Sequence, residues 1–181
     1  MKTSITKEIE MKFVDFLYDK KYELAVQECS IAGGRYGIVD ILSYHGKRQG
    51  NGRGRPRTRV VTWKCYEIKV SKADFYSKHK LTFVGDYNYF VVPIELYPII
   101  EKDIPKGIGC YVYDGFDFKV AKKAFRQKMT ISESQMNHDF LVSSSRDARR
   151  WMRTKFAGGW LKSHLFLLQK ATFKFKIINF Y

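Results

Sequence analysis

Hydrophobic and polar positions in the first quarter of the chain predict a helix followed by two strands. Residues 4–21 place apolar side chains at the spacing of an amphipathic helix: Ile9, Phe13, Phe16 and Leu17. The stretches "YELAVQECSI" and "YGIVDILSY" have the alternating or continuous apolar pattern of strands, and "GGR" breaks the pattern between them. We therefore expect the order helix, strand, strand.

The pattern then changes at "HGKRQGNGRGRPRTR", where glycines and basic residues replace every apolar residue. This segment predicts a mobile loop that projects from the sheet. A third strand is expected at "VVTWKCYEIKV" and a helix at "SKADFYSKHKLTF", with Ser71 as its cap. "YNYFVVPIEL" predicts a fourth strand, which ends at Pro93 because proline cannot donate to a central ladder.

The second half of the chain predicts a short connection, a hairpin and helices. "IELYPIIEKDI" is typical of a helical connection interrupted by Pro98. "GIGCYVYDGFDFKVAKKA" predicts a hairpin that turns at Asp114 and Gly115, with a helix from about Val120 as the alternative. "SESQ" is a capping-box pattern that opens one helix, and "SSSRDARRWMRTKFAGG" predicts another that stops at Gly158. The pattern of the last residues fits neither helix nor strand alone.

Length and charge add a class of partner to this picture. The 181 residues favour one domain with an appendage, and the formal net charge of +15 favours a polyanion as ligand. Seven basic residues and no acid lie in residues 46–64, and 14 basic against 3 acidic residues lie from Lys119 onward. Nucleic acid is the expected partner; the alternative is a basic protein without one.

Cysteine usage and hydropathy bear on the compartment. The three cysteines are far apart and form no CxxC pair, which predicts neither a disulfide framework nor a zinc site and favours a reducing setting. No stretch resembles a signal peptide or is long and apolar enough to span a bilayer. We expect a cytoplasmic protein of a bacterium or a phage-infected cell, with no membrane partner.

The third strand carries an acid and a base near its end. Glu67 and Lys69 share one face of this strand, about 6.6 Å apart, and Asp40 of the preceding strand can lie about 4.8 Å away in a suitable register. Two carboxylates at that distance repel unless a cation lies between them, and oxygen ligands favour Mg²⁺ or Mn²⁺. Lys69 would then hold a water or a phosphate. The alternative is a solvent-exposed Asp40 and an ordinary surface pair.

Four stretches carry a resemblance to a known family: "IVDIL", "YEIKVSKADF", "DYNYFVVP" and "GIGCYVYDG". Over about residues 5–124 the chain resembles the PD-(D/E)xK nuclease superfamily, and within it the MmcB-like DNA-repair and phage-encoded proteins. The resemblance implies an α/β, restriction-endonuclease-like core of order αβββαβ, with a central mixed four-stranded sheet flanked by helices, and Mg²⁺-dependent cleavage of DNA. Val39 stands where the family has its proline.

The resemblance also implies roles for single residues. Asp40 and Glu67 would bind the metal, Lys69 would be the catalytic lysine, and Glu28 would be an additional catalytic acid. Glu8 is a further candidate on the first helix. The expected function is a Mg²⁺-dependent DNA nuclease; the alternative is a catalytically silent nucleic-acid-binding module of a phage or repair assembly.

We expect a nuclease-like core at residues 1–125, with a basic Gly/Arg loop at 46–59, and a basic, mostly helical C-terminal extension at 126–181 packed on the core. DNA is the expected partner, RNA stays open, and a homodimer is a further option. Basic residues of the loop, of the helix after the motif and of the extension are expected to bind nucleic acid: Lys47, Arg48, Arg53, Arg55, Arg57, Arg59, Lys72, Arg146, Arg149, Arg150 and Arg153. The alternative for each group is a solvated charged surface.

Overall fold

The protein has an α/β fold in which helices flank a mixed sheet. The structure, a computed structural model, describes residues 3–19, 23–49, 58–77 and 81–156. The chain divides into two compact units, Met1–Ser144 and Ser145–Tyr181. The proposed functional boundary at residue 125 stays a prediction.

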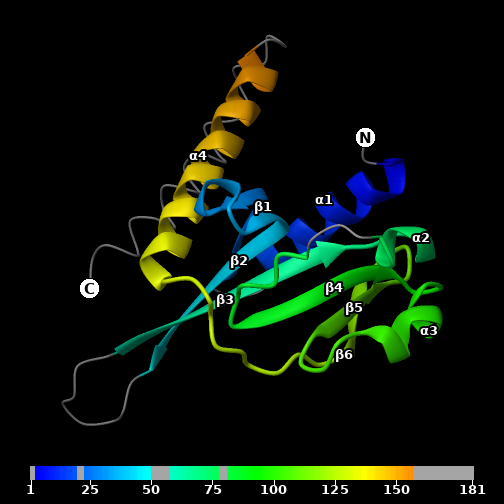
Figure 1. The fold of residues 1–181 in the computed structure, drawn as a ribbon. Helices are drawn as coiled ribbons and strands as arrows, with labels where there is room; N and C mark the ends of the chain where they lie inside the picture. Colours follow the sequence, from blue (N-terminus) through cyan, green and yellow to red (C-terminus); the bar gives the residue numbers. More distant parts are fainter. Residues whose placement is uncertain (1–2, 20–22, 50–57, 78–80, 157–181) are drawn as a thin grey trace. The chain divides into compact units, whose positions relative to one another are not determined.

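Figure 1 shows the order of the elements along the chain. They are α1 (Ser4–Asp19), β1 (Glu23–Ile31), η1 (Ala32–Gly34), β2 (Gly37–Gln49), β3 (Thr58–Ile68), α2 (Lys72–Phe75), β4 (Tyr87–Pro93), α3 (Tyr97–Ile100), η2 (Glu101–Asp103), β5 (Gly109–Tyr113), β6 (Phe118–Lys122) and α4 (Glu133–Phe156).

Among the described residues the sheet has six strands, in the order β1-β2-β3-β4-β5-β6. The first three strands and the β5–β6 hairpin pair antiparallel, whereas β3, β4 and β5 run parallel. Parallel neighbours need crossover connections, and α2 and α3 lie in those two crossovers. The expected sheet of four strands was therefore too small, because the hairpin predicted near residue 115 joins the same sheet.

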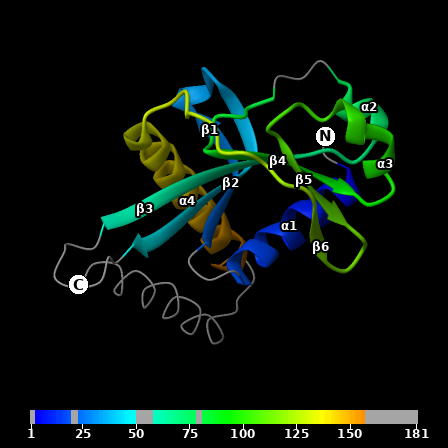
Figure 2. The ribbon, with the colours of Figure 1, turned by 90° about the horizontal axis from the view of Figure 1, so that it is seen from below.

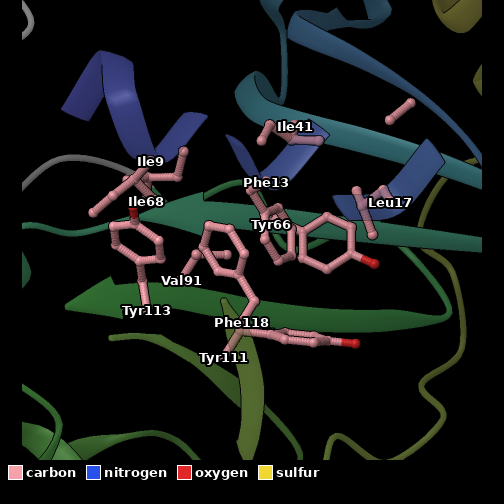
Figure 3. Close-up of a cluster of buried hydrophobic side chains, with 11 residues drawn as sticks. Ile9, Phe13, Leu17, Ile41, Tyr66, Ile68, Val91, Tyr111, Tyr113 and Phe118 are labelled. Atoms are coloured by element: carbon pink, nitrogen blue, oxygen red, sulfur yellow. The ribbon is translucent and has the colours of Figure 1, made fainter. Parts of the chain in front are cut away.

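Helix α1 covers one face of the sheet with an aromatic core. Its residues Ile9, Phe13 and Leu17 are buried among side chains of β2 to β6. The Phe13 ring lies edge-on to Tyr66 and Phe118, with ring centroids 4.9 Å away in both cases. Figure 3 shows Phe13 at the centre of this cluster. The predicted apolar stripe of the first helix is confirmed.

The opposite face of the sheet is covered by two further clusters. Trp63 and Cys65 of β3 pack with Met136, from the start of α4. Phe90 of β4 packs with Ile100 of α3. Figure 2 shows α1 and α3 flanking the sheet. Because Tyr66 and Ile68 face α1, alternation along β3 turns Glu67 to the other face.

The expected loop after residue 45 is shorter than its composition predicts. Strand β2 continues to Gln49 and β3 begins at Thr58, since the two strands supply each other's backbone hydrogen bonds as far as the pair Gln49↔Thr58. Apolar periodicity misses such strands because no core face selects their side chains. Arg53, Arg55 and Arg57 lie outside the described residues.

Two helix predictions need correction. Of the helix expected at 71–83, the described residues form only Lys72–Phe75, and Leu81 and Phe83 pack against the third cluster in a segment without helical structure. The two helices expected after Ser132 form the single helix α4, whose residues 133–156 contain neither glycine nor proline. Ser132 accepts from the Gln135 backbone N–H (3.2 Å), as a capping residue does. The predicted stop at Gly158 lies outside the described residues.

The β5–β6 hairpin confirms the turn at Asp114 and Gly115 and excludes a helix from Val120. Gly115 has a φ of 96°, and the Asp114 carboxylate accepts from the backbone N–H groups of Phe116 and Asp117. The three cysteines are free and buried. No helix within the described ranges has the length and apolar character needed to cross a membrane.

Phe13→Ala is expected to lower the free energy of unfolding by about 3–5 kcal/mol, because it removes a fully buried ring and leaves a cavity. Urea denaturation measures the change. Met11→Ala is the control on the same helix, since Met11 is 61% exposed, and it should change the stability by less than about 0.5 kcal/mol. Equal effects of the two substitutions would contradict this core.

Candidate active site

Asp40 and Glu67 lie next to each other where β2 and β3 separate. The ladder pairs Ile41 with Tyr66, and one further step in the same register leads to Asp40 and Glu67. At that step the Asp40 Oδ2 atom accepts a hydrogen bond of 2.9 Å from the Ile68 backbone N–H. The carboxylate thus takes the place of a backbone carbonyl, which fixes it beside Glu67.

Glu67 is buried and held by the chain segment before β4. Its side chain is 6% exposed, and its Oε1 atom accepts from the Thr82 backbone N–H at 3.2 Å. The Thr82 hydroxyl in turn donates to the Tyr36 carbonyl at 3.2 Å. The next residue, Gly37, has a φ of 109°, and a Cβ there would lie 2.4 Å from Thr82 Oγ1. A glycine is therefore needed for β2 to approach the residue that holds Glu67.

The electrostatic environment of Glu67 disfavours its charge. Burial and, next, the nearby Asp40 carboxylate raise the pKa of Glu67 to about 8. The Thr82 N–H and the Lys69 ammonium oppose this rise, and Asp74 adds to it. Two further carboxyl groups and a single lysine thus act on Glu67, in a chain whose formal net charge is +15. A cation at this place would relieve the repulsion.

Lys69 lies in the same site but is engaged by Asp74. Its side chain is 8% exposed, and its Nζ atom is 3.5 Å from Asp74 Oδ1. Asp74 is fixed in turn, because its other oxygen accepts from the Val70 backbone N–H at 3.2 Å and its own N–H donates to the Ser71 hydroxyl at 3.1 Å. The first turn of α2 therefore positions the ammonium group.

Glu28 lies on β1, which pairs with β2, at the position opposite Asp40. The β1–β2 ladder pairs Gln27 with Ile41 and Cys29 with Val39, which puts Glu28 opposite Asp40. Its φ of 46° is unusual for a residue other than glycine. Such conformations cost about 1–3 kcal/mol and concentrate at functional sites. Register thus brings Glu28, Asp40 and Glu67 onto three neighbouring strands.

Glu8 lies elsewhere. It is on α1, where its carboxylate accepts from Lys12 (2.9 Å) and from the Tyr113 hydroxyl (3.0 Å). Tyr113 belongs to the cluster on the α1 face of the sheet, opposite to the face that Glu67 occupies. Glu8 is therefore not part of the carboxylate group.

The donor atoms at this site suit a hard cation. Within the described ranges no group of three or more His, Cys, Asp or Glu side chains is arranged to hold a metal ion, so the candidate ligands are the pair Asp40 and Glu67. Mg²⁺ commonly binds through one or two carboxylates and keeps several waters. Burial raises the pKa of the Cys65 thiol, two residues before Glu67, to about 12. The candidate ligands are carboxylate oxygens, and they fit Mg²⁺ or Mn²⁺.

The predicted nucleic-acid-binding residues lie on several different strands and helices. Lys47, Arg48 and Arg59 are on the paired ends of β2 and β3, and Lys72 is exposed on α2. In the second unit three arginines of α4 are exposed, Arg149, Arg150 and Arg153, whereas Arg146 is half-buried and donates to Asp147 at 3.0 Å. Their contacts with nucleic acid stay predictions.

Pattern reasoning missed the roles of three residues, two at this site and one at the start of β1. Asp74 supports Lys69, and the spacing of Ser71 and Asp74 at a helix start was a usable signal. Thr82 holds Glu67, and no sequence signal marked it. Glu23 is buried and binds the Lys64 ammonium at 2.9 Å. Lys64 therefore belongs to an internal pair rather than to the basic segment at 46–64.

Comparisons with known proteins show the fold but no family. No protein-family model matches the sequence, and no curated protein matches it. Among solved structures the chain is similar to the SPO1766 protein of unknown function from Silicibacter pomeroyi, with a TM-score of 0.58 and 16% sequence identity. The similarity covers 90% of this chain and 98% of that one.

In EDTA, the stability of the protein is expected to fall as the pH rises from about 4.5 to about 8, because folded Glu67 keeps its proton in this range and the unfolded residue releases it. Glu67→Gln removes this contribution. The variant should match the wild type at about pH 5 and exceed it by a few kcal/mol at about pH 9, since one pKa unit corresponds to about 1.4 kcal/mol.

Urea denaturation of both proteins across this range measures the difference. The amide oxygen of the glutamine can still accept from the Thr82 N–H, so the hydrogen bond is not the variable. A stability difference that does not change with pH would contradict the buried position of Glu67.

Proposed function

We propose that the protein is a Mg²⁺-dependent DNA nuclease of the PD-(D/E)xK type with a restriction-endonuclease-like core. The observation that carries this proposal is the buried Glu67 carboxylate beside Asp40, with Lys69 in the same site. An acid pair with a neighbouring lysine is the arrangement that the "EIK" motif implies.

The fold supports the proposal without deciding it. The order α1-β1-β2-β3-α2-β4 is the order αβββαβ that the resemblance implies. The three antiparallel strands followed by a parallel crossover put Asp40 and Glu67 on neighbouring strands, as the motif requires. Strands β5 and β6 extend that arrangement.

The roles of the residues follow from their positions. Asp40 and Glu67 would hold Mg²⁺, which lowers the pKa of a bound water and neutralises charge on phosphate oxygens. Lys69 would orient the attacking water or stabilise charge on the scissile phosphate through its ammonium group. Asp74 would hold that ammonium group in place, and Lys72, exposed on α2, would contact the phosphate backbone near the site.

DNA as the substrate rests on charge. The chain carries 33 basic and 18 acidic residues, and such an excess binds polyphosphates through release of their counterions. Acidic side chains nevertheless gather at one place in this basic chain, namely Asp40, Glu67 and Asp74. Acidic groups inside a basic surface suit a metal ion that faces a phosphodiester.

The second candidate function is a nuclease-like module that binds nucleic acid without cutting it. Two observations favour it. Lys69 is buried and engaged by Asp74, and the described residues offer two clear metal ligands rather than three. Both candidates predict salt-sensitive DNA binding, so only cleavage separates them.

Plasmid and single-stranded DNA incubated with the protein should be cut in Mg²⁺ or Mn²⁺ and left intact in EDTA. Glu67→Gln and Asp40→Asn should each lower the rate by at least about 100-fold, because each removes a ligand of the cation that stabilises the transition state. Lys69→Met should lower the rate by a similar factor while Mg²⁺ binding, measured by calorimetry, is retained.

Glu95→Gln is the matched control, because Glu95 is an exposed carboxylate outside the site. It should cleave like the wild type, and all variants should bind DNA with the wild-type affinity in EDTA. Cleavage that persists in Glu67→Gln would contradict this site. Wild-type protein that binds DNA and cuts none under any metal would support the binding module instead.

A further inference from the structure

The ends of β2 and β3 form a two-stranded extension of the sheet. We call residues 46–49 of β2 and 58–61 of β3 the basic arm. The arm is paired from Gly46↔Val61 to Gln49↔Thr58. In the part of the chain that the structure describes, β1 pairs with β2 only as far as His45, and β4 pairs with β3 only from Lys64. Figure 1 shows the two strands extending together beyond the start of β4.

The stability of the folded protein does not explain why the two strands extend this far beyond the sheet. An isolated two-stranded ribbon is only marginally stable in water. Arg48 and Arg59 occupy directly opposite positions of the ladder, next to the pair Lys47↔Val60. Like charges at opposite positions destabilise a strand pair. A bound anionic ligand would compensate this repulsion between positive charges and would stabilise the strand pair.

We propose that the basic arm is a groove-binding element for duplex DNA, separate from the carboxylate site. The inference deepens the proposed function and rests on its assignment of DNA as the ligand. It uses only the arm residues whose backbone the structure describes: Lys47, Arg48 and Arg59.

The shape of the arm favours duplex DNA. The major groove of B-DNA is about 12 Å wide and about 8.5 Å deep, and it admits a two-stranded β-ribbon. The four residues of β2 in the arm extend about 13 Å at strand spacing, which is enough to reach the floor of the groove. The major groove of an RNA duplex is narrow and deep, and it does not admit such a ribbon.

The composition of the arm argues against a single-stranded ligand. Residues 46–49 and 58–61 contain no aromatic and no acidic residue. Proteins that bind single strands stack the bases on aromatic side chains. The nearest aromatic residues, Tyr44 and Trp63, pack against each other and Phe140 in the second core cluster. The arm offers phosphate-binding charge without a stacking surface.

Strand β3 links the arm to the carboxylate site. Arg59 and Glu67 are eight residues apart on this strand, about 26 Å at strand spacing. The arm would therefore hold duplex DNA at a fixed distance from the bond to be cut.

The test compares the full-length wild type with the triple variant Lys47→Ser, Arg48→Ser, Arg59→Ser by fluorescence anisotropy in EDTA. The probes are a DNA duplex of about two helical turns, one of its single strands, and an RNA duplex of the same length. The triple variant should bind the DNA duplex at least about 10-fold more weakly, and the slope of log affinity against log salt should decrease by about 3.

Affinity for the single strand and the RNA duplex should fall by a clearly smaller factor than affinity for the DNA duplex, because only the DNA duplex has a groove that admits the arm. The control is Lys102→Ser, Lys106→Ser, Lys123→Ser, which removes the same charge from exposed lysines elsewhere. If the triple variant does not fold, Arg59→Ser alone should lower the salt slope by about 1.

Three results would overturn the proposal: wild-type duplex affinity in the arm variant, equal losses for duplex and single strand, or an equal loss in the control. Its failure is distinguishable from that of the nuclease assignment. If the wild type cuts no DNA but the arm variant loses duplex binding, the arm proposal is supported and the nuclease assignment is not. If the arm variant binds duplex DNA like the wild type and the wild type cuts DNA, the arm proposal is contradicted and the nuclease assignment stands.

Discussion

The antiparallel pairing of β2 with β3 is the interaction on which the rest of the structure depends. At one end the register brings Asp40 next to Glu67, and at the other it forms the basic arm. Along its length the same two strands supply Ile41 and Tyr66 to the α1 core and Leu42 and Cys65 to the core on the opposite face. A shift of one residue would turn each of these side chains to the wrong face and would separate the two carboxylates.

The two ends of this ladder differ in how their polar groups are satisfied. At the carboxylate end β2 leaves β3, and the Asp40 side chain replaces the missing backbone partner of Ile68. The second carboxylate is then held in a buried position by Thr82, although burial disfavours its charge. Buried like charges weaken a fold unless a ligand compensates them, and such strain is typical of functional sites. The arm carries the same kind of conflict with cations in place of anions.

Sequence patterns predicted the parts of the fold that periodicity controls. The α1 stripe, strands β1 to β4, the turn at Asp114 and the capping residue Ser132 all carry short-range signals. The extension of β2 to Gln49 has no such signal, because backbone pairing rather than burial creates it. The shortness of α2 has no local signal either, because it accompanies the packing of Leu81 and Phe83 into the third cluster. The joining of β5 and β6 to the main sheet is likewise a long-range event. Within the site, alternation put Glu67 and Lys69 on one face, but only the folded chain revealed that Asp74 and Thr82 hold them.

The central claim is that Asp40 and Glu67 share one divalent cation. A crystal structure of the protein with Mn²⁺, with data collected at an energy where manganese scatters anomalously, tests it most directly. The account predicts one anomalous peak in contact with carboxylate oxygens of both residues, and no peak there in Glu67→Gln. A wild-type structure with no peak between these carboxylates at saturating Mn²⁺, or with the peak at other ligands, would contradict it.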